Sequence, residues 1–377
     1  MNSDIKIKHI HDTESFEKLK TAWGVLLSNS SIQSTFLTWE WLFTWWQVNG
    51  GKKKLWLITA WRGENLVALA PLMLEKRNTL IRVLTNIGTP QSDISGFIHA
   101  LDDKAAIKAI TQYLVLNKKN WDILELNEFP CAWVEQPEFS QSFNFNAFWS
   151  LKDHNQHFYI QLDHDDWEKY SERLARKFRY NLRRALRLAE EIGPVELDRY
   201  QGNQVNWDIF KTIIEINRYA HYPRLYNSPS EQQLIKELVE RMALNQNYFE
   251  VYILSVNKKP IAYEYGFVYQ GRFEDWRSGF DTRLPSNVSI GKVLAMKVTQ
   301  ACISGTYTEI DFLRGDEAYK QEWVPSSRDF TKIRIFNRRK LPAILSYFWL
   351  EKIKPYLKKE NAESKDSPVT PEETSSE

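Results

Sequence analysis

At 377 residues the chain is long enough for two domains, and either half can bury a hydrophobic core. Its 43% hydrophobic and 26% charged residues are ordinary for a soluble protein, and no apolar run approaches the roughly 20 residues that a helix needs to span a bilayer. The net charge of +2 is nearly balanced, which argues against a general preference for polyanions.

Residues 1–150 are expected to form a first domain. Apolar residues at helical spacing predict its helices, and runs rich in β-branched and aromatic residues predict its strands. Pro71 lies in the second strand of a hairpin, so we expect that strand to be interrupted or at a sheet edge there. The turn 89–93 could contact a substrate, although a plain surface turn is the favoured interpretation. The expected elements are a strand over 5–10, helices over 12–30 and 36–48, a hairpin over 55–76, strands within 81–100, a helix over 102–119 and a strand over 121–129.

Residues 151–340 are expected to form a second domain, followed by a C-terminal helix over 341–359. The last residues, 360–377, are acidic and lack aromatic side chains, which is typical of a disordered tail. Ahead of its central stretch, the domain is expected to contain a strand over 158–164, a long helix over 167–192, a strand over 194–200, helices over 206–222 and 228–246, and a hairpin turning at 257–260. A last strand is expected over 329–339.

The central stretch of the second domain, 261–323, predicts a possible anion site. The strands IAYEYGFVYQ and RFEDWRSGFD meet at Gln270-Gly271, which predicts a hairpin. The loop TRLPSNVS then leads into a helix over 290–304, and Gly305 ends it. The first amides of a helix have no internal partner, and the macrodipole favours an anion there, so this helix start could hold a diphosphate.

These residues also resemble a known family. The order Ser289-Ile290-Gly291, a helix, then Asp311-Phe312-Leu313-Arg314-Gly315-Asp316 and Tyr319-Lys320-x-x-Trp323 resembles the C-terminal half of the CelD-like (cellulose biosynthesis type) acetyltransferases. That family belongs to the GNAT superfamily and is close to the FemAB-type aminoacyl transferases that build peptidoglycan bridges. The resemblance extends over roughly residues 30–335. It implies a mixed α/β fold with two tandem GNAT-like acyltransferase domains, the first degenerate, and an acyl-CoA donor, most simply acetyl-CoA.

The donor is expected to bind at the helix start in the second domain. Backbone amides of the loop and first turn would hold the diphosphate, and Gly291 would let it approach closely. The usual GNAT pattern R/Q-x-x-G-x-G/A is absent, and Ile290 stands where the family has a proline. An ordinary strand-to-helix loop is the alternative. The residues assigned to the donor are Asn287, Val288, Ser289, Gly291 and Lys292.

The resemblance and the strand positions also indicate catalytic residues. By resemblance Tyr319 protonates the CoA thiolate or hydrogen-bonds its sulfur; a packed surface tyrosine is the alternative. The base is expected to be Glu264, whose half-burial among tyrosines would raise its pKa, or Asp311, at the carboxyl end of its strand where ligands gather. Lys320 is expected to hold a substrate carboxylate or phosphate, or to be a solvated charge. Trp276, one of 15 tryptophans, is assigned to substrate binding.

The predicted helix over 167–192 has a strongly basic face. An apolar stripe runs along one side, and seven cations lie on the opposite side. Like charges at this spacing cost a few tenths of a kcal/mol each. A solvated face is one interpretation; an anionic ligand bound by Arg179 and Arg183 is the other, for example a nucleotide-linked sugar, a lipid phosphate, a CoA phosphate or tRNA. The stripe is Leu174, Phe178, Leu182, Ala185 and Ala189, and the cations are Arg173, Arg176, Lys177, Arg179, Arg183, Arg184 and Arg187.

The remaining signals concern metals and the compartment. His154, His157 and His164 cluster in sequence, but no Cys or carboxylate set completes a zinc pattern, so no metal is expected. Cys131 and Cys302 form no spacing motif, which favours a reducing compartment. The first residues do not resemble a signal peptide, and the protein is expected to be cytoplasmic.

Taken together, these patterns predict an acyl-CoA-dependent N- or O-acyltransferase acting on a sugar, a polysaccharide precursor or an amino compound. One alternative is a FemAB-like aminoacyl-tRNA-dependent transferase, which the basic helix suits and the near-neutral chain does not. Another is a non-catalytic binding protein that retains the fold, which the missing glycine pattern suits. The sequence does not name the acceptor.

Overall fold

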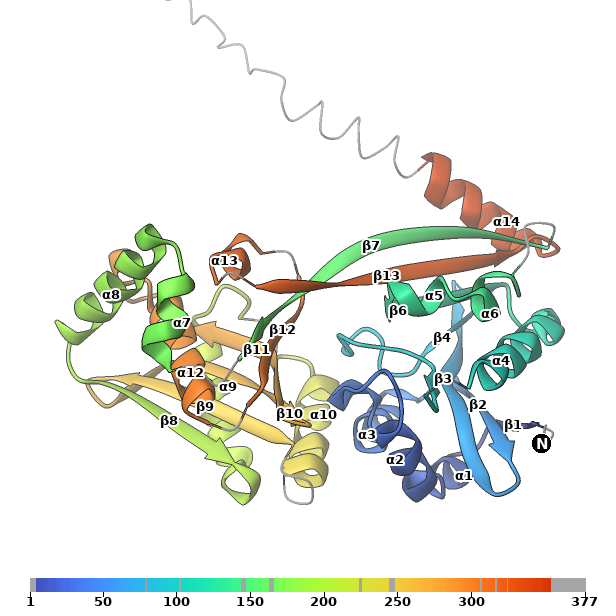
Figure 1. Cartoon of the computed structure of the whole chain (residues 1–377), viewed down its shortest axis with the longest axis horizontal. Coiled ribbons are helices and arrows are strands. Elements are labelled where there is room, and N and C mark those ends of the chain that lie inside the picture. The colour runs from blue at the N-terminus through green and yellow to red at the C-terminus, as the bar shows by residue number, and fades with distance from the viewer. Residues whose placement is uncertain are drawn as a thin grey trace, which may run out of the picture.

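A computed structural model of the chain describes residues 5–353, apart from 79, 102, 144–146, 163–165, 224–225, 244–247, 306, 316 and 324. A thirteen-stranded sheet runs through the whole molecule, with helices on its faces (Figure 1). The expected tail over 360–377, the end of the C-terminal helix, His164 and Asp316 lie outside the described residues.

The first half of the chain contains most of the elements expected from its sequence. The helix expected over 12–30 is broken into two at Lys18 and Leu19. The expectation that Pro71 interrupts its strand or marks an edge is wrong: the strand is continuous, and Pro71 lies where its neighbour changes from β5 to β4. The elements are β1 (Lys6–Ile10), α1 (Thr13–Glu17), α2 (Lys20–Ser28), η1 (Thr35–Leu37), α3 (Trp39–Asn49), β2 (Lys54–Arg62), β3 (Asn65–Arg77), β4 (Ile81–Asn86), β5 (Ile98–His99), α4 (Lys104–Leu116), η2 (Lys118–Asn120), β6 (Ile123–Pro130), α5 (Cys131–Val134) and α6 (Pro137–Ser140).

The second half differs from expectation at one helix. The single helix expected over 167–192 is wrong: α7 and α8 are separated at Leu174 and Ala175, whose backbones are extended, with ψ of 148° and 138°. The elements are β7 (Phe148–Gln161), α7 (Trp167–Arg173), α8 (Arg176–Glu190), β8 (Val195–Gln201), η3 (Gly202–Gln204), α9 (Trp207–Asn217), α10 (Pro229–Leu238), η4 (Val239–Ala243), β9 (Phe249–Val256), β10 (Lys259–Tyr269), β11 (Arg272–Phe280), η5 (Ser286–Val288), α12 (Ile290–Ser304), β12 (Glu309–Arg314), α13 (Ala318–Gln321), β13 (Ser326–Asn337), α14 (Leu341–Phe348) and η6 (Trp349–Ile353).

The strands follow the same arrangement when the sheet is followed inward from either of its two edges. Its strand order is β1-β2-β3-β4-β6-β13-β7-β12-β11-β10-β9-β8, with β5 beside β3. In each half an antiparallel meander is followed by a helix and then a parallel strand: β4 pairs in parallel with β6, and β11 pairs in parallel with β12. The mixed α/β class is therefore confirmed, and the repetition agrees with two tandem domains of one fold.

Two long strands connect the halves. β7 and β13 pair along their length, from Ser326 opposite Tyr159 to Asn337 opposite Phe148 (Figure 1). β13 also pairs with β6, so a strand from the end of the chain completes the sheet of the first half. The expected boundary between residues 150 and 151 lies within β7, and the division into domains remains a prediction.

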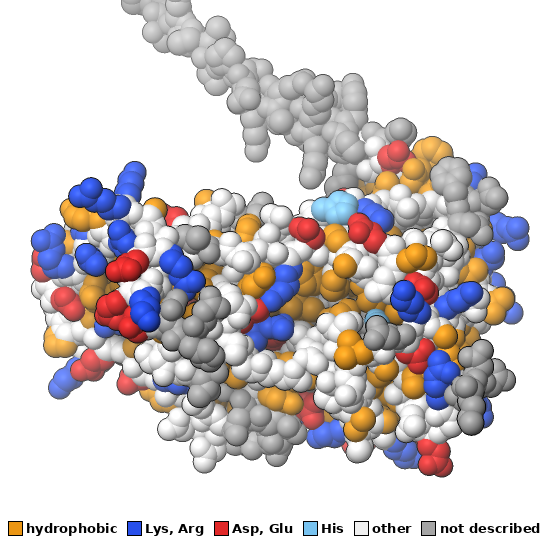
Figure 2. Space-filling view, in the orientation of Figure 1, with side chains coloured by type: hydrophobic (Ala, Val, Ile, Leu, Met, Phe, Trp, Pro, Cys, Tyr) orange, Lys and Arg blue, Asp and Glu red, His pale blue; other side chains and the backbone are white. Residues whose placement is uncertain are grey.

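An aromatic core is shared by the two halves. α3 packs against α10, and the rings of Phe36 and Trp41 from the first half contact Phe267 and Trp276 from the second, with centroids 4.8–6.2 Å apart within this group. Such rings bury large areas, so the halves pack as one body. Away from this core, α14 follows the end of β13 and leaves apolar side chains at the surface (Figure 2).

Candidate active site

A gap opens in the sheet of the second half where β11 and β12 separate. The two strands pair in parallel over only three residues, ending at Glu274 opposite Asp311. β11 then continues to Phe280, and the start of α12 lies beside the gap. The gap holds a cavity of about 520 Å³, which we name the splay cavity. It is lined by Phe178 of α8, Glu264 of β10, Asp275 and residues 278–280 of β11, residues 289–292, and Tyr319, among others.

Three of the five residues assigned to the donor line this cavity. Ser289, Gly291 and Lys292 contribute to its wall, whereas Val288 is buried in the core and Asn287 is exposed. Ser289 has a left-handed backbone with φ of 50° and begins α12. A Cβ on Gly291 would lie 2.9 Å from the ring of Phe280, so the glycine also admits this ring beside the helix start. Whether these residues bind a donor stays a prediction.

A second hollow, of about 1360 Å³, lies between the two halves; we name it the central cleft. Asp93, from the turn 89–93, and residues 154–156 line it from one side, and Trp276, Arg277 and Arg314 line it from the other. The interpretation of 89–93 as a plain surface turn therefore fails for Asp93, which is 4% exposed and ion-paired with Arg314 at 2.7 Å. The residues that line both hollows are His221, Asp275, Ser278, Gly279, Phe280, Phe312 and Tyr319.

Two carboxyl groups on neighbouring strands face the splay cavity. Burial, and then the charge of Asp275, raise the pKa of Glu264 well above its usual range, which favours its protonated form. Burial raises the pKa of Asp275 to about 7, against the opposing effect of Lys320. Asp275 is not among the carboxylates that the sequence singled out, which were Glu264 and Asp311. The available signal was its place directly after Glu274, since adjacent strand residues point to opposite faces of a sheet.

Tyr319 lies where the two hollows meet. It belongs to the short helix α13 and is 45% exposed. Desolvation, followed by the charges of Asp275 and Glu264, raises the pKa of its hydroxyl, so the hydroxyl is protonated at neutral pH. A protonated hydroxyl beside a carboxyl group that titrates near neutrality is an arrangement that can move protons in both directions.

Lys320 and Asp311 make contacts within the protein. The Lys320 ammonium donates to the carbonyls of Phe312 at 3.0 Å, Arg314 at 2.9 Å and Gly315 at 3.3 Å. It lines the central cleft, but the predicted binding of a substrate anion would require these contacts to be exchanged. Asp311 is 1% exposed and is not among the residues that line either hollow.

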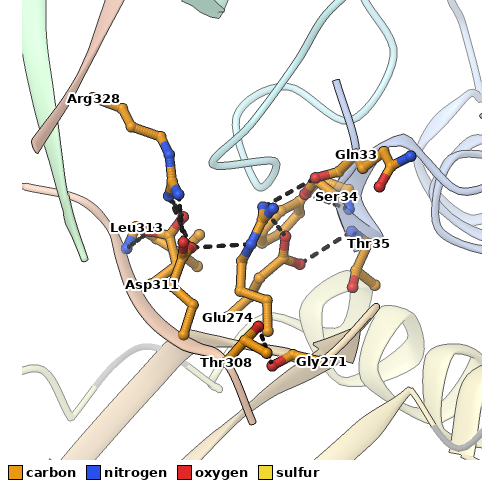
Figure 3. Close-up of polar contacts among 12 residues, drawn as sticks. Gln33, Ser34, Thr35, Gly271, Glu274, Thr308, Asp311, Leu313 and Arg328 are labelled. Atoms are coloured by element: carbon orange, nitrogen blue, oxygen red, sulfur yellow. Dashed lines mark hydrogen bonds and ion pairs between the residues drawn. The ribbon is translucent and has the colours of Figure 1, made fainter. Parts of the chain in front are cut away.

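A buried ionic network surrounds Asp311 at the base of the gap (Figure 3). Its carboxylate accepts from the Leu313 amide at 2.8 Å and from Arg328 at 3.1 Å. Glu274 accepts from the Thr35 amide at 3.0 Å, which ties β11 to the first half. The network supports the split strands, so its contacts favour a structural role for Asp311 over the predicted role as base.

The basic face of α8 is exposed next to the splay cavity. The predicted apolar stripe is confirmed, because its five residues are buried. Arg179 donates to the carbonyl of Glu172 at 2.9 Å and so caps the end of α7, whereas Arg183 is exposed. α8 packs against η5 and α12, and Figure 2 shows its cations gathered at one end of the molecule.

Two histidines of the predicted cluster, His154 and His157, contact other side chains of the protein. His154 lies 3.4 Å from the Cys131 sulfur, and His157 is buried 3.2 Å from Glu128 and stacked on Phe330. Over the described ranges, no three His, Cys, Asp or Glu side chains are grouped to hold a metal ion. A search of those same ranges also finds no helix with the length and apolar character needed to cross a membrane.

Comparisons with known proteins agree with this geometry. Residues 176–321, from α8 to α13, match the family described as acetyltransferase (GNAT) domain. No curated protein matches the chain. Among solved structures, FemX superposes with a TM-score of 0.58 at 8% identity, over 86% of this chain and 96% of FemX.

Two further structures share the fold at similar distance. L-PGS from Bacillus licheniformis has a TM-score of 0.52 at 12% identity, over 89% of this chain and 96% of its own. The C-terminal domain of a putative lysylphosphatidylglycerol synthetase from Agrobacterium fabrum has a TM-score of 0.53 at 10% identity, over 90% and 97%. The family match confirms the expectation of an acyltransferase, and it places a GNAT-type acetyltransferase domain at residues 176–321.

Proposed function

We propose that this protein is an acyl-CoA-dependent N- or O-acyltransferase, with acetyl-CoA as its simplest donor, of the CelD-like type. One observation carries the proposal: the splay cavity extends from the start of α12 to the central cleft, and Asp275 and Tyr319 line both. A donor in the cavity and an acceptor in the cleft would meet at these two side chains.

The splay cavity suits an acyl-CoA in size and lining. Its volume of about 520 Å³ lies in the range of small-molecule sites. Apolar residues such as Phe178, Leu294 and Phe312 line it, which suits a pantetheine chain. The start of α12 supplies the positive end of the helix dipole for a diphosphate, although the Lys292 amide already donates to the Ser289 carbonyl at 2.9 Å.

The two side chains at the junction can serve the chemistry of acyl transfer. Asp275, with its pKa raised to about 7, would take a proton from the acceptor amine or hydroxyl. The freed lone pair attacks the thioester carbonyl, and the tetrahedral intermediate then expels the thiolate. Tyr319 would protonate that thiolate and recover its proton from Asp275, so the products are the acylated acceptor and CoA-SH. Glu264, kept neutral, would donate a hydrogen bond into the cavity.

The central cleft supports a polar acceptor. Within the described residues, Trp276 Nε1 and Asn155 Oδ1 are buried atoms without a hydrogen-bond partner, one a donor and one an acceptor. Asp93 and Arg314 add one charge of each sign. A sugar, polysaccharide precursor or amino compound carries hydroxyl and amino groups that would hydrogen-bond with the polar and charged groups lining this cleft, and Trp276 keeps its proposed role in binding it.

A FemAB-like aminoacyl-tRNA-dependent transferase is the second candidate, because the exposed cations of α8 would suit an RNA backbone. A non-catalytic binding protein is the third, since the GNAT glycine pattern is missing. We favour the acyl-CoA enzyme because the cavity lies inside the fold, where a pantetheine chain fits. The expected compartment remains the cytoplasm, and both cysteines are free thiols, as expected there.

Thermal unfolding with acetyl-CoA, desulfo-CoA or bulk tRNA tests these candidates. At 100 times its Kd, a donor should add about 2.7 kcal/mol to the free energy of unfolding. Ser289→Asp should abolish the stabilisation by CoA compounds, because a carboxylate would face the diphosphate, whereas Ser289→Asn should keep it; both residues tolerate the left-handed backbone. Ser289 is a cleaner probe than Gly291, where any side chain collides with Phe280.

The outcomes separate the three candidates. Stabilisation by acetyl-CoA that survives in Ser289→Asn and not in Ser289→Asp supports the proposal. Equal stabilisation of both variants refutes the donor loop. Retention of tRNA with a steep salt dependence, lost in Arg183→Glu with Arg184→Glu, would favour the aminoacyl transferase, and no response to either ligand would favour the binding protein.

A further inference from the structure

The C-terminal segment formed by α14 and η6 has apolar side chains on two opposite sides. One side packs against the sheet: Ala343 is buried with Phe336, and the ring of Tyr347 lies 4.6 Å from that of Trp149. The opposite side, which we name the outer face, consists of Leu341, Leu345, Phe348, Trp349 and Ile353, each between 45% and 66% exposed.

The outer face is larger than ordinary scatter of apolar residues on a surface. Its members are four, three, one and four positions apart, which places them along one side of a helix. A helix that is apolar all round is normally buried, and contiguous exposed apolar patches mark interaction sites. In Figure 2 apolar side chains are visible over α14, which follows the end of β13.

The charge of the sequence in and next to this segment indicates the kind of partner. Residues 338–359 contain seven cations and a single acid, Glu351. Basic residues beside an apolar helix face, with a tryptophan among the apolar residues, are typical of helices that lie in the interface of an anionic membrane. The cations are Arg338, Arg339, Lys340, Lys352, Lys354, Lys358 and Lys359.

Other occupants fit less well. The chain after Lys359 contains one large aliphatic residue, Val369, so its sequence offers almost no apolar surface to cover the outer face. A second copy would bring the same cations together, and their repulsion opposes self-association through this segment. An anionic lipid surface instead satisfies the apolar side chains and the cations at once.

We propose that α14 and η6 bind the surface of an anionic membrane, with the outer face inserted at the level of the headgroups. The segment contributes no residue to the described lining of the splay cavity or the central cleft, so binding would leave the active site accessible. The inference is independent of the proposed chemistry. It would place the acyltransferase beside acceptors held at a membrane.

Co-sedimentation of the full chain with vesicles tests this. The protein should bind vesicles of phosphatidylglycerol and phosphatidylcholine in equal parts, should bind phosphatidylcholine alone far more weakly, and should be released by salt. Leu345→Glu with Trp349→Glu should lower the partition coefficient at least about 10²-fold, because two inserted side chains are lost. Both residues point outward, so the melting temperature should be unchanged.

A matched control carries the same chemical change elsewhere. Val25→Glu with Leu101→Glu replaces two residues that are 63% and 61% exposed, and it should bind vesicles like the wild type. Arg339→Gln with Lys340→Gln should weaken binding about 10-fold or more to anionic vesicles and should leave the outer face intact.

Three results would overturn the proposal. The first is equal vesicle binding by wild type and by Leu345→Glu with Trp349→Glu. The second is equal binding to anionic and neutral vesicles, which would remove the role of the cations. The third is a wild-type dimer that the same double variant dissociates while vesicles bind neither protein, which would make the outer face a contact between copies. If the double glutamate variant does not fold, the glutamine pair decides the question by the same comparison of vesicles.

Discussion

In both halves of the sheet two parallel strands pair over a short distance and then separate, but the halves differ in what occupies the gap between them. β4 and β6 pair over three residues ending at Thr85 opposite Glu125, as β11 and β12 pair over three ending at Glu274 opposite Asp311. In the first half, residues of the protein fill the gap beyond Thr85 and Glu125. In the second half the gap is the splay cavity.

The difference begins at the first residue beyond the last parallel pair, which is Asn86 in one half and Asp275 in the other. The Asn86 amide bridges the gap: its oxygen accepts from the Asn127 amide at 3.0 Å, and its nitrogen donates to the Ser95 hydroxyl at 2.7 Å. The Ser95 amide in turn donates to the Glu128 carbonyl at 2.8 Å. Asp275 has no amide protons with which to bridge strands, and it faces both hollows.

This comparison indicates how one fold can supply a scaffold and a site. An amide that donates and accepts can join two separated strands, whereas a carboxyl group in the same position leaves them apart and titrates near neutrality. The first half then supports the sheet and one wall of the central cleft, and the proposed reaction belongs to the second. Four changes test this division, given from the largest expected effect to the smallest.

Asp275→Asn should have the largest effect. If Asp275 is the base, kcat should fall about 10³-fold, because an amide cannot accept the acceptor's proton. In the wild type kcat/KM should rise with pH through about 7, where Asp275 loses its proton, and the variant should lack this limb. Glu264→Gln is the control: it mimics the protonated form that burial of Glu264 favours, so the limb should remain. An Asp275→Asn enzyme with an unchanged pH profile would contradict the assignment.

Tyr319→Phe should have the next largest effect. Loss of the acid that protonates the thiolate should lower kcat about 10²-fold. Donor binding should change little, because the aromatic ring and its contacts remain. Single-turnover rates and acetyl-CoA affinity, measured on the same preparation, separate the two quantities. Full turnover in the phenylalanine variant would leave Tyr319 as a packed surface residue, the alternative considered from the sequence.

Asn86→Ala should affect stability and spare chemistry. It leaves the Asn127 amide and the Ser95 hydroxyl without these partners in the closed split, at a cost of about 2–3 kcal/mol of unfolding free energy. Urea unfolding should show the loss, while acetyl-CoA affinity of the folded fraction stays the same. Asn29→Ala, at the exposed end of α2, should cost well under 1 kcal/mol by comparison. A large loss of acetyl-CoA affinity in Asn86→Ala would break the division between the halves.

The sequence predicts the local parts of this arrangement and misses the distant ones. The hairpin at Gln270-Gly271 and the helix over 290–304 follow from turn chemistry and periodicity, and both are present; the two turn residues have the positive φ angles that this turn needs. The extended backbone at Leu174 and Ala175 carries no Gly or Pro signal, so periodicity runs through it. The places of β7 and β13 depend on pairings between residues far apart in the chain.

The same limit applies to the candidate site. Tyr319, Glu264 and Ser289 were predicted from a motif, a strand pattern and a helix start, and each lies at the splay cavity. Asp311 has the same local pattern as a catalytic carboxylate, but its partner Arg328 comes from another strand, 17 residues later. Whether Glu274 or Asp275 faces a ligand depends on where β11 and β12 separate. The local sequence does not show where this separation occurs.

Glu274→Gln should have the smallest effect, and it makes the second split resemble the first, where the uncharged Thr85 holds the corresponding position. Burial raises the pKa of Glu274 to about 7, opposed by Arg272 and reinforced by Asp311. Below the ordinary pKa, the carboxyl group is protonated in both folded and unfolded chains. As pH rises from there to about 7, the unfolded chain releases the proton and the folded protein keeps it, so this group lowers the unfolding free energy over that window.

Glutamine removes the titration and can still accept from the Thr35 amide. The fall in stability between pH 5 and pH 8 should therefore be smaller in the variant by about 1–2 kcal/mol, as measured by urea unfolding at each pH. A variant whose stability runs parallel to that of the wild type would show that Glu274 is already ionised throughout, and the network at the base of the gap would then hold three buried carboxylates, Glu274, Glu309 and Asp311, against Arg272 and Arg328.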